Sequence, residues 1–131
     1  MGLCMTECIK PQLQKLKAVD WLTMTTFNEG YFDGHIFSTN VSVLHYVQKH
    51  YGDGPSLHRH EYDEIFVVLR GNGLFKIGDR IIEASAGDVL FGPARLPHKF
   101  KNNGIEPLET LDIHLNDRWI QENLKDLDED W

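Results

Sequence analysis

The sequence predicts an all-β domain, folded as a sandwich or a barrel and followed by a short helix. β-Branched and aromatic residues are frequent between Trp21 and Leu115, and turn signals interrupt them about every eight to twelve residues, as is typical of such folds. Hydrophobic residues make up 41% of the chain and charged residues 25%, and its 131 residues suffice for one core. The turn signals are Asn28-Glu29-Gly30, Asp33-Gly34, Gly52-Asp53-Gly54-Pro55, Gly71-Asn72-Gly73, Gly78-Asp79, Ala86-Gly87-Asp88 and Asn102-Asn103-Gly104.

Residues 1–20 form the first predicted segment. Pro11 suits the first position of a helix, and Leu13 and Leu16 would share one side of it, so a short helix is expected over residues 11–19. The segment could equally be an arm that packs on the barrel or on a second subunit. A disulfide between its two cysteines, Cys4 and Cys8, would close only a tiny loop, so we interpret both as reduced thiols.

Residues 21–115 form the predicted barrel, within which residues 63–69 are distinctive. Nearly every side chain there is apolar, which predicts a strand covered on both faces. Glu64 is the exception, and a carboxylate at the start of such a strand needs a partner. A salt bridge to a nearby arginine is the ordinary explanation for Glu64 taken alone.

The last predicted strand, residues 108–115, alternates between two faces. One face is apolar, and the other carries Thr110, Asp112 and His114. If the polar face lines the interior, Asp112 and His114 are candidates for proton transfer or for supporting a nearby site. If it points outward, both are merely solvated, and the sequence leaves the two alternatives open.

Residues 116–131 are expected to form a C-terminal helix with a solvated acidic end. Asn116 or Asp117 could cap the helix, which would extend to about Leu127. Its apolar stripe would consist of Trp119, Ile120, Leu124 and Leu127.

Three histidines and one glutamate have spacings that suit a single divalent metal ion. His58 and His60 lie two residues apart, so a strand would project both from the same face. A small bend would bring Glu64 to the same centre, and a later strand would supply His98. Imidazole and carboxylate ligation admits iron, manganese, nickel, cobalt, copper or zinc.

The residues around these four positions closely resemble the two motifs of the cupin superfamily. The first motif reads Gly52-x5-His58-x-His60-x3-Glu64-x6-Gly71, and the second reads Gly87-x5-Pro93-x-Arg95-x2-His98-x3-Asn102. Arg95 stands where the second motif usually has glycine. The resemblance implies a double-stranded β-helix, or jelly-roll, cupin barrel over residues 21–115. It also implies one divalent metal ion in the barrel mouth, bound by His58, His60, Glu64 and His98.

Two classes of function follow from this resemblance. Many cupins with all four ligands are dioxygenases, isomerases or lyases, so one interpretation is a metal-dependent enzyme acting on a small oxygen-bearing anion or aromatic compound. Glu64 and His114 are then the candidate catalytic residues. The alternative is a non-catalytic protein that binds or senses a small ligand or a metal.

Several further side chains are candidate substrate contacts. Arg95 could hold a carboxylate or phosphate through its planar guanidinium group, although a surface ion pair is as good an explanation. Phe66 and Phe100 are expected to form apolar walls beside the metal. Tyr62 and Tyr46 are weaker candidates, because core packing is the commoner role of tyrosine.

The charge pattern and the hydropathy restrict the partners. A net charge of −7 argues against nucleic acid, since non-specific binding there depends on lysine and arginine. No apolar run approaches the roughly 20 residues of a membrane span, and no signal-peptide pattern is seen, so a cytoplasmic protein is expected. The apolar residues of the first forty positions exceed what a short barrel can bury, which favours a homodimer.

Overall fold

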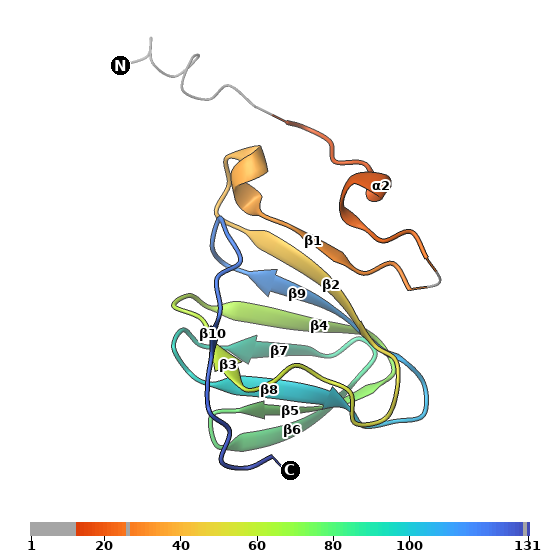
Figure 1. Ribbon diagram of the computed structural model, residues 1–131, viewed down its shortest axis with the longest axis vertical. Coiled ribbons are helices and arrows are strands. Elements are labelled where there is room, and N and C mark those ends of the chain that lie inside the picture. The colour runs from red at the N-terminus through yellow and green to blue at the C-terminus, as the bar shows by residue number, and fades with distance from the viewer. Residues whose placement is uncertain (1–12, 26, 130) are drawn as a thin grey trace.

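Two antiparallel sheets face each other in the computed structural model, which describes residues 13–25, 27–129 and 131 (Figure 1). One sheet has the strand order β1-β2-β9-β4-β7, and the other has the order β10-β3-β8-β5-β6. The sequence prediction of an all-β jelly-roll barrel is confirmed. The strands are β1 (Gly30–Phe32), β2 (Ser42–Gln48), β3 (His58–Arg59), β4 (Glu64–Arg70), β5 (Asn72–Ile77), β6 (Arg80–Ser85), β7 (Val89–Gly92), β8 (His98–Asn102), β9 (Leu108–His114) and β10 (Glu122–Asn123).

The hydrophobic core fills one half of the space between the sheets. Its members come from strands of both sheets, and their alternation places them inward. The polar residues of the candidate site occupy the other half, so the barrel has a dry end and a polar end. The core consists of Phe66, Val68, Phe75, Ile77, Ala84, Leu90, Phe100 and Leu108.

Glycine at the predicted turns serves the backbone. Gly52, Gly71 and Gly87 all have positive φ, as their turn positions suggested. Gly71 joins β4 to β5, and a side chain there would lie 2.4 Å from the carbonyl oxygen of Pro107. Glycine therefore lets this hairpin pack against the loop before β9.

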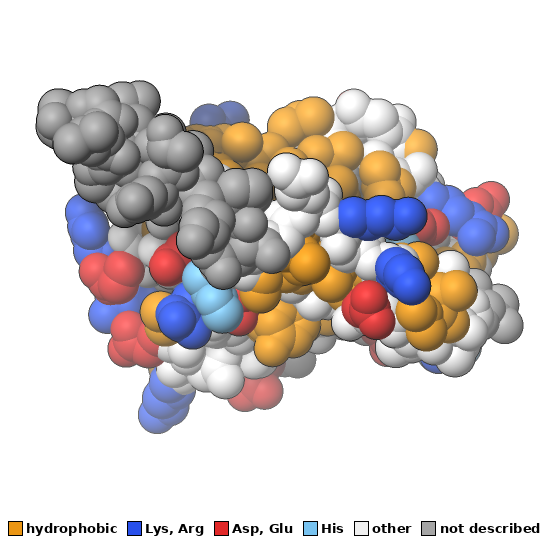
Figure 2. All heavy atoms as spheres, turned by 90° about the horizontal axis from the view of Figure 1, so that it is seen from above, with side chains coloured by type: hydrophobic (Ala, Val, Ile, Leu, Met, Phe, Trp, Pro, Cys, Tyr) orange, Lys and Arg blue, Asp and Glu red, His pale blue; other side chains and the backbone are white. Residues whose placement is uncertain are grey.

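The N-terminal helix is much shorter than the sequence suggested. Residues 13–17 are not helical, and α2 (Ala18–Trp21) has only four residues, none of them buried. Pro11, Cys4 and Cys8 lie outside the described residues. A 3₁₀ turn, η1 (Gly34–Phe37), follows β1, and Figure 2 shows hydrophobic side chains at the surface of the end that carries η1 and α2.

The prediction of a C-terminal helix over residues 116–127 is wrong. The chain instead runs extended across the second sheet, where β10 pairs with β3 and the Leu124 amide donates to the Leu57 carbonyl at 3.0 Å. Two members of the expected apolar stripe are not buried, since Ile120 is 59% and Leu127 is 88% exposed. Pairing with the free edge of β3 satisfies backbone groups that a helix would leave unpaired there.

The sequence predicts a solvated acidic end, but its side chains make ion pairs with the second sheet. The ammonium of Lys99, which is buried, lies 2.5 Å from a carboxylate oxygen of Asp126, and Lys76 pairs with Asp128 at 2.8 Å. The ring of Trp131 lies 4.9 Å from the ammonium of Lys99. We call residues 116–131 the tail, and its described part is tied to the outer surface of β5 and β8. No helix among the described residues has the length and apolar character that crossing a membrane requires.

Candidate metal centre

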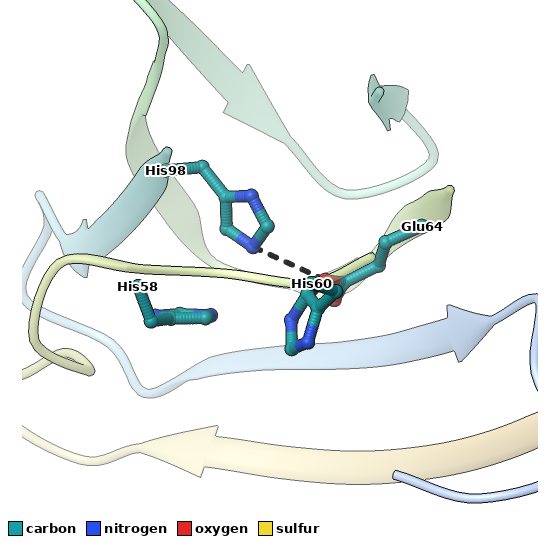
Figure 3. Close-up of side chains that lie close together, drawn as sticks. All are labelled: His58, His60, Glu64 and His98. Carbon is teal, nitrogen blue, oxygen red and sulfur yellow. Dashed lines mark ion pairs between the residues drawn. The ribbon is translucent and has the colours of Figure 1, made fainter. Parts of the chain in front are cut away.

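Three strands and one loop bring the four predicted ligands together. His58 begins β3, His98 begins β8 and lies directly opposite it, and Glu64 begins β4. His60 lies in the short loop between β3 and β4. All four side chains are buried and point toward one another, and one ligand atom from each lies within 4.8 Å of the others (Figure 3).

Backbone carbonyls determine which histidine nitrogen faces this cluster. The Nδ1 atom of His58 lies 2.6 Å from the carbonyl oxygen of Ser56, and that of His60 lies 2.7 Å from the carbonyl oxygen of Ile120. A carbonyl oxygen can only accept, so each Nδ1 carries the proton. In the neutral rings each Nε2 is then a lone-pair acceptor, which is the form that binds a metal.

The contact between His60 and Glu64 places two acceptors face to face. The Nε2 atom of His60 and the Nε2 atom of His98 each lie 3.1 Å from Oε1 of Glu64. Among the described residues all three atoms are buried and have no hydrogen-bond partner. Buried acceptors in this arrangement require a proton or a metal cation between them. Three imidazoles and one carboxylate fit a divalent transition metal ion.

The ionisation of these ligands favours metal binding at neutral pH. Burial, followed by the neighbouring His98, lowers the pKa of His58 to about 4, so this ring is neutral. Burial would raise the pKa of Glu64, but contacts with His114, His60 and His98 hold it well below its usual value. The cluster thus offers a carboxylate and at least one neutral imidazole.

His114 lies beside the other oxygen of Glu64. The two residues lie directly opposite each other on β9 and β4, and Nε2 of His114 lies 3.3 Å from Oε2 of Glu64. On its far side, Nδ1 of His114 lies 2.8 Å from the hydroxyl of Tyr62. That hydroxyl donates to the Ile120 carbonyl at 3.0 Å and accepts from the Ile120 amide at 3.1 Å. The carboxylate is thereby oriented with one oxygen toward the cluster.

The alternation of polar and apolar side chains along β9 is the reverse of the usual one, in which the apolar face points inward. Its polar face points inward, because Thr110, Asp112 and His114 are buried while Leu111 and Ile113 are partly exposed. The structure thus decides between the two alternatives that the sequence left open. Burial and then the charge of Glu64 raise the pKa of Asp112 well above its usual value, which favours the neutral form of this carboxyl.

The predicted substrate contacts lie at different distances from the cluster. The ring of Phe66 lies 5.2 Å from that of His98, and Phe100 stacks on Phe75 with 5.0 Å between ring centroids. Arg95 adopts the left-handed conformation, with a φ of 67°, which accounts for the glycine usual at this position. Its side chain is 65% exposed and lies 3.8 Å from Glu61. Phe66 thus lies against a ligand, whereas the guanidinium group of Arg95 is at the surface.

A small cavity of about 10 Å³ lies beside the cluster, which is room for about one water or one ligand oxygen. Its polar lining includes Glu64, Asp112 and His114. The other lining residues are Leu44, Tyr46, Pro55, His58, Phe100 and Gln121.

Two parts of this site have no signal in the sequence. The carbonyl groups of Ser56 and Ile120 orient two ligands, but a carbonyl is present at every position and marks none of them. Trp119 was assigned to a helix, yet its ring lies 6.3 Å from that of His114 and 5.0 Å from that of Tyr31. Trp119 and Ile120 reach the barrel mouth because the tail is extended. The sequence predicts a helix there, so it does not predict this placement.

The comparison with protein families identifies a cupin domain in this chain. The family model described as a cupin domain matches residues 44–114, which is more than half of the chain and includes all four ligands.

Three similar proteins illustrate the range of relatives. The chain is 36% identical over 61 residues to an uncharacterized protein of Methanocaldococcus jannaschii. It is 35% identical over 63 residues to an oxalate-binding protein of Thermotoga maritima. These matches cover 46% and 47% of this chain, and 49% and 52% of the relatives, so the chain spans about half the length of the relatives it matches. A solved structure of Bacillus subtilis oxalate decarboxylase, which has Mn(II) centres, superposes with a TM-score of 0.69 and 22% identity. That superposition covers 79% of this chain and 30% of the decarboxylase, and it shows a shared fold.

Proposed function

The chain belongs to the cupin domain family, and from this premise we propose that it is a metal-dependent enzyme acting on a small oxygen-bearing anion or aromatic compound. One divalent ion, of iron, manganese, nickel, cobalt, copper or zinc, would be held by His58, His60, Glu64 and His98. The reaction would be of the dioxygenase, isomerase or lyase type. A small molecule, rather than nucleic acid, is the expected partner, and the net charge of −7 supports this.

A single observation carries the metal-binding part of the proposal. The Nδ1 proton of His60 is committed to the Ile120 carbonyl, so in the neutral ring Nε2 can only accept, and the atom it faces at 3.1 Å is a carboxylate oxygen. Two lone pairs at this distance in a buried site repel each other unless a proton or a metal cation lies between them. His58 and His98 complete a set of nitrogen donors around the same point.

The other residues of the site have supporting roles in this proposal. When bound, a divalent ion would polarise a substrate oxygen. Glu64 is the candidate base, and His114, in contact with its second oxygen, is placed to receive or return a proton. Phe66 and Phe100 would exclude water from the reacting atoms, and Tyr62 would fix the ring of His114.

Arg95 remains our proposed orienting group for an anionic substrate. Its backbone amide donates to the carbonyl of His60 at 2.6 Å, which anchors the loop beside a metal ligand. The side chain is mostly solvated and only loosely paired with Glu61, so it could leave Glu61 for a substrate carboxylate.

Replacement of His60 tests the metal site. His60→Ala removes one donor, so the variant should lose its metal in a mild chelator that leaves the metal in the parent protein. Metal content would be measured by mass spectrometry after dialysis, with the exposed His50→Ala as the matched control. Equal retention of metal by His60→Ala and the control would contradict the assignment.

A non-catalytic binding protein is the second candidate function. The relative from Thermotoga maritima is an oxalate-binding protein, and a metal site can hold an anion without transforming it. If the metal-loaded protein binds small oxygen-bearing anions but turns none of them over, with or without O₂, this second function would be favoured. In either case we propose a cytoplasmic location, consistent with two cysteines interpreted as reduced thiols.

A further inference from the structure

A second, larger pocket lies beside the small cavity at the metal ligands. It has a volume of about 240 Å³, and an apolar cavity of about 150 Å³ is already large enough to bind benzene. Leu44 and Tyr46 line both spaces, so the two adjoin. The remaining lining residues of the larger pocket are Thr23, Glu29, Gly30, Tyr31, His45 and Trp119.

The larger pocket lies at the open edge of the first sheet. Tyr31 on β1 is directly opposite Leu44 on β2, so both side chains are on the inner face of the sheet. The ring of Trp119, from the tail, meets the ring of Tyr31 edge to face at 5.0 Å. The pocket wall is therefore built from the segment before β1, from β1, from β2 and from the tail, while the metal ligands come from β3, β4, β8 and the loop that carries His60.

The polar side chains of this pocket are engaged with the protein itself. The Nε2 atom of His45 lies 2.6 Å from Glu109, the carboxylate of Glu29 accepts from the Val47 amide at 3.1 Å, and the hydroxyl of Thr23 donates to the Phe27 carbonyl at 2.9 Å. What the pocket offers a ligand is accordingly the surface of two aromatic rings and a leucine. Such a surface favours an apolar or aromatic group.

Tyr46 stands between the two spaces. Burial, followed by the charges of Asp112, Glu29 and Glu64, raises its pKa, so the hydroxyl stays protonated and remains a donor. A ligand that crosses from one space to the other could accept this proton with an oxygen atom.

We propose that the ligand of this protein is an oxygen-bearing acid with an aromatic or apolar substituent, whose polar end reaches the metal ligands while the substituent lies between Tyr31, Leu44 and Trp119. This inference rests on the proposed function and deepens it. Oxalate has no substituent to place in the larger pocket. The geometry thus separates this chain's ligand preference from that of its oxalate-binding relative.

Three acids that share one polar end test the inference. Oxalate, pyruvate and phenylpyruvate all present a carboxylate with an adjacent oxygen, and only the last carries a ring. Binding would be measured by calorimetry on zinc-loaded protein, since zinc does no redox chemistry. Phenylpyruvate should bind at least about tenfold more tightly than pyruvate, because burying the ring removes apolar area from water.

Two variants locate the ring. In Trp119→Ala and in Tyr31→Ala the ratio of the two dissociation constants should fall toward one, whereas Tyr51→Ala, an exposed tyrosine outside the pocket, should keep the ratio of the parent. Tyr46→Phe should weaken all three acids alike, by about tenfold, the effect of losing one hydrogen bond.

The possible results distinguish a failure of this inference from a failure of the proposed function. Equal affinity of the parent for pyruvate and phenylpyruvate would overturn the inference while metal-dependent anion binding stands. A preference for phenylpyruvate that survives in both Trp119→Ala and Tyr31→Ala would also overturn it, because the ring would then bind elsewhere. If none of the three acids binds the zinc-loaded protein, the proposed function itself fails.

Discussion

Asp112 is the residue whose chemistry departs furthest from its sequence appearance. An aspartate in an alternating strand suggests a solvated charge, but this carboxyl is buried and its pKa is raised, which favours the neutral form. In the unfolded chain the same group ionises near its ordinary value of 3.8, so folding at a pH between that value and the folded pKa takes up a proton. Stability is therefore lost as the pH rises from about 3.8 toward the folded pKa.

Asp112→Asn should remove this dependence. The amide is neutral at every pH, so the variant should become more stable than the parent, with a difference in unfolding free energy that grows by up to about 1.4 kcal/mol for each pH unit above 3.8 until the folded pKa is reached. Denaturant unfolding of metal-free protein at a series of pH values would measure it. Comparison with the parent cancels the opposite effect of His58, whose pKa of about 4 costs stability as the pH falls below about 6.5. A constant difference at all pH values would contradict a neutral Asp112.

Tyr62 is the second residue with a definite expected effect. Tyr62→Phe removes the hydroxyl that contacts His114 and both backbone groups of Ile120. The loss should lower the unfolding free energy by about 1 to 2 kcal/mol and weaken metal binding about tenfold, since Glu64 would be less well oriented. Calorimetric titration with Zn²⁺ and denaturant unfolding measure the two effects. Tyr51→Phe, at an exposed tyrosine, is the control, and unchanged zinc affinity in Tyr62→Phe would mean that this contact chain does not support the site.

At the scale of elements, the sequence predicted the strands better than the termini. Turns such as the one at Gly71 can be predicted from local sequence, because a positive φ is a property of one residue. The motif spacing predicted four metal ligands, and the structure brings these four residues together. The tail could not be predicted in the same way. Helical spacing of Trp119, Ile120 and Leu124 describes a helix only if some surface covers the stripe, and here the free edge of β3 offers backbone pairing instead. That competition depends on tertiary structure.

The attachment of the tail gives the prediction at this scale. Asp126 pairs with the ammonium of Lys99, which is 4% exposed, and the loss of Asp126 would leave a buried charge without its carboxylate. Asp126→Asn should lower the melting temperature by several degrees. Asp128→Asn affects a more solvated pair and should change it little, so the two variants form a matched comparison by differential scanning calorimetry. Equal melting temperatures would show that the Lys99 pair does not hold the tail.

At the scale of the whole molecule, the outer face of the first sheet is unusually apolar. Ile65 lies between Phe91 and Ile113, and Val67 lies between Val89 and Leu111, so six apolar side chains share the outward surface. Phe91 is 53% and Val89 is 65% exposed. Together with the apolar end shown in Figure 2, this surface supports the homodimer expected from the sequence.

Light scattering at micromolar concentration tests the dimer. The expected mass is twice 15.1 kDa, because burial of this apolar face should outweigh the entropy lost on association. Phe91→Lys should shift the protein toward the monomer, while Ile105→Lys, at a fully exposed loop position, should not. A parent protein that remains at 15.1 kDa would reject the assembly.

The carbonyl of Ile120 has a consequence that reaches across the molecule. This one oxygen accepts from the ring of His60 and from the hydroxyl of Tyr62, so the tail contributes to the position of a metal ligand. Binding at the cluster and seating of the tail are then two equilibria that share a free energy of coupling, and such coupling acts equally in both directions. Whatever occupies the four ligands tightens the tail, and whatever loosens the tail, including events at its distant contacts with Lys76 and Lys99, releases the occupant more readily.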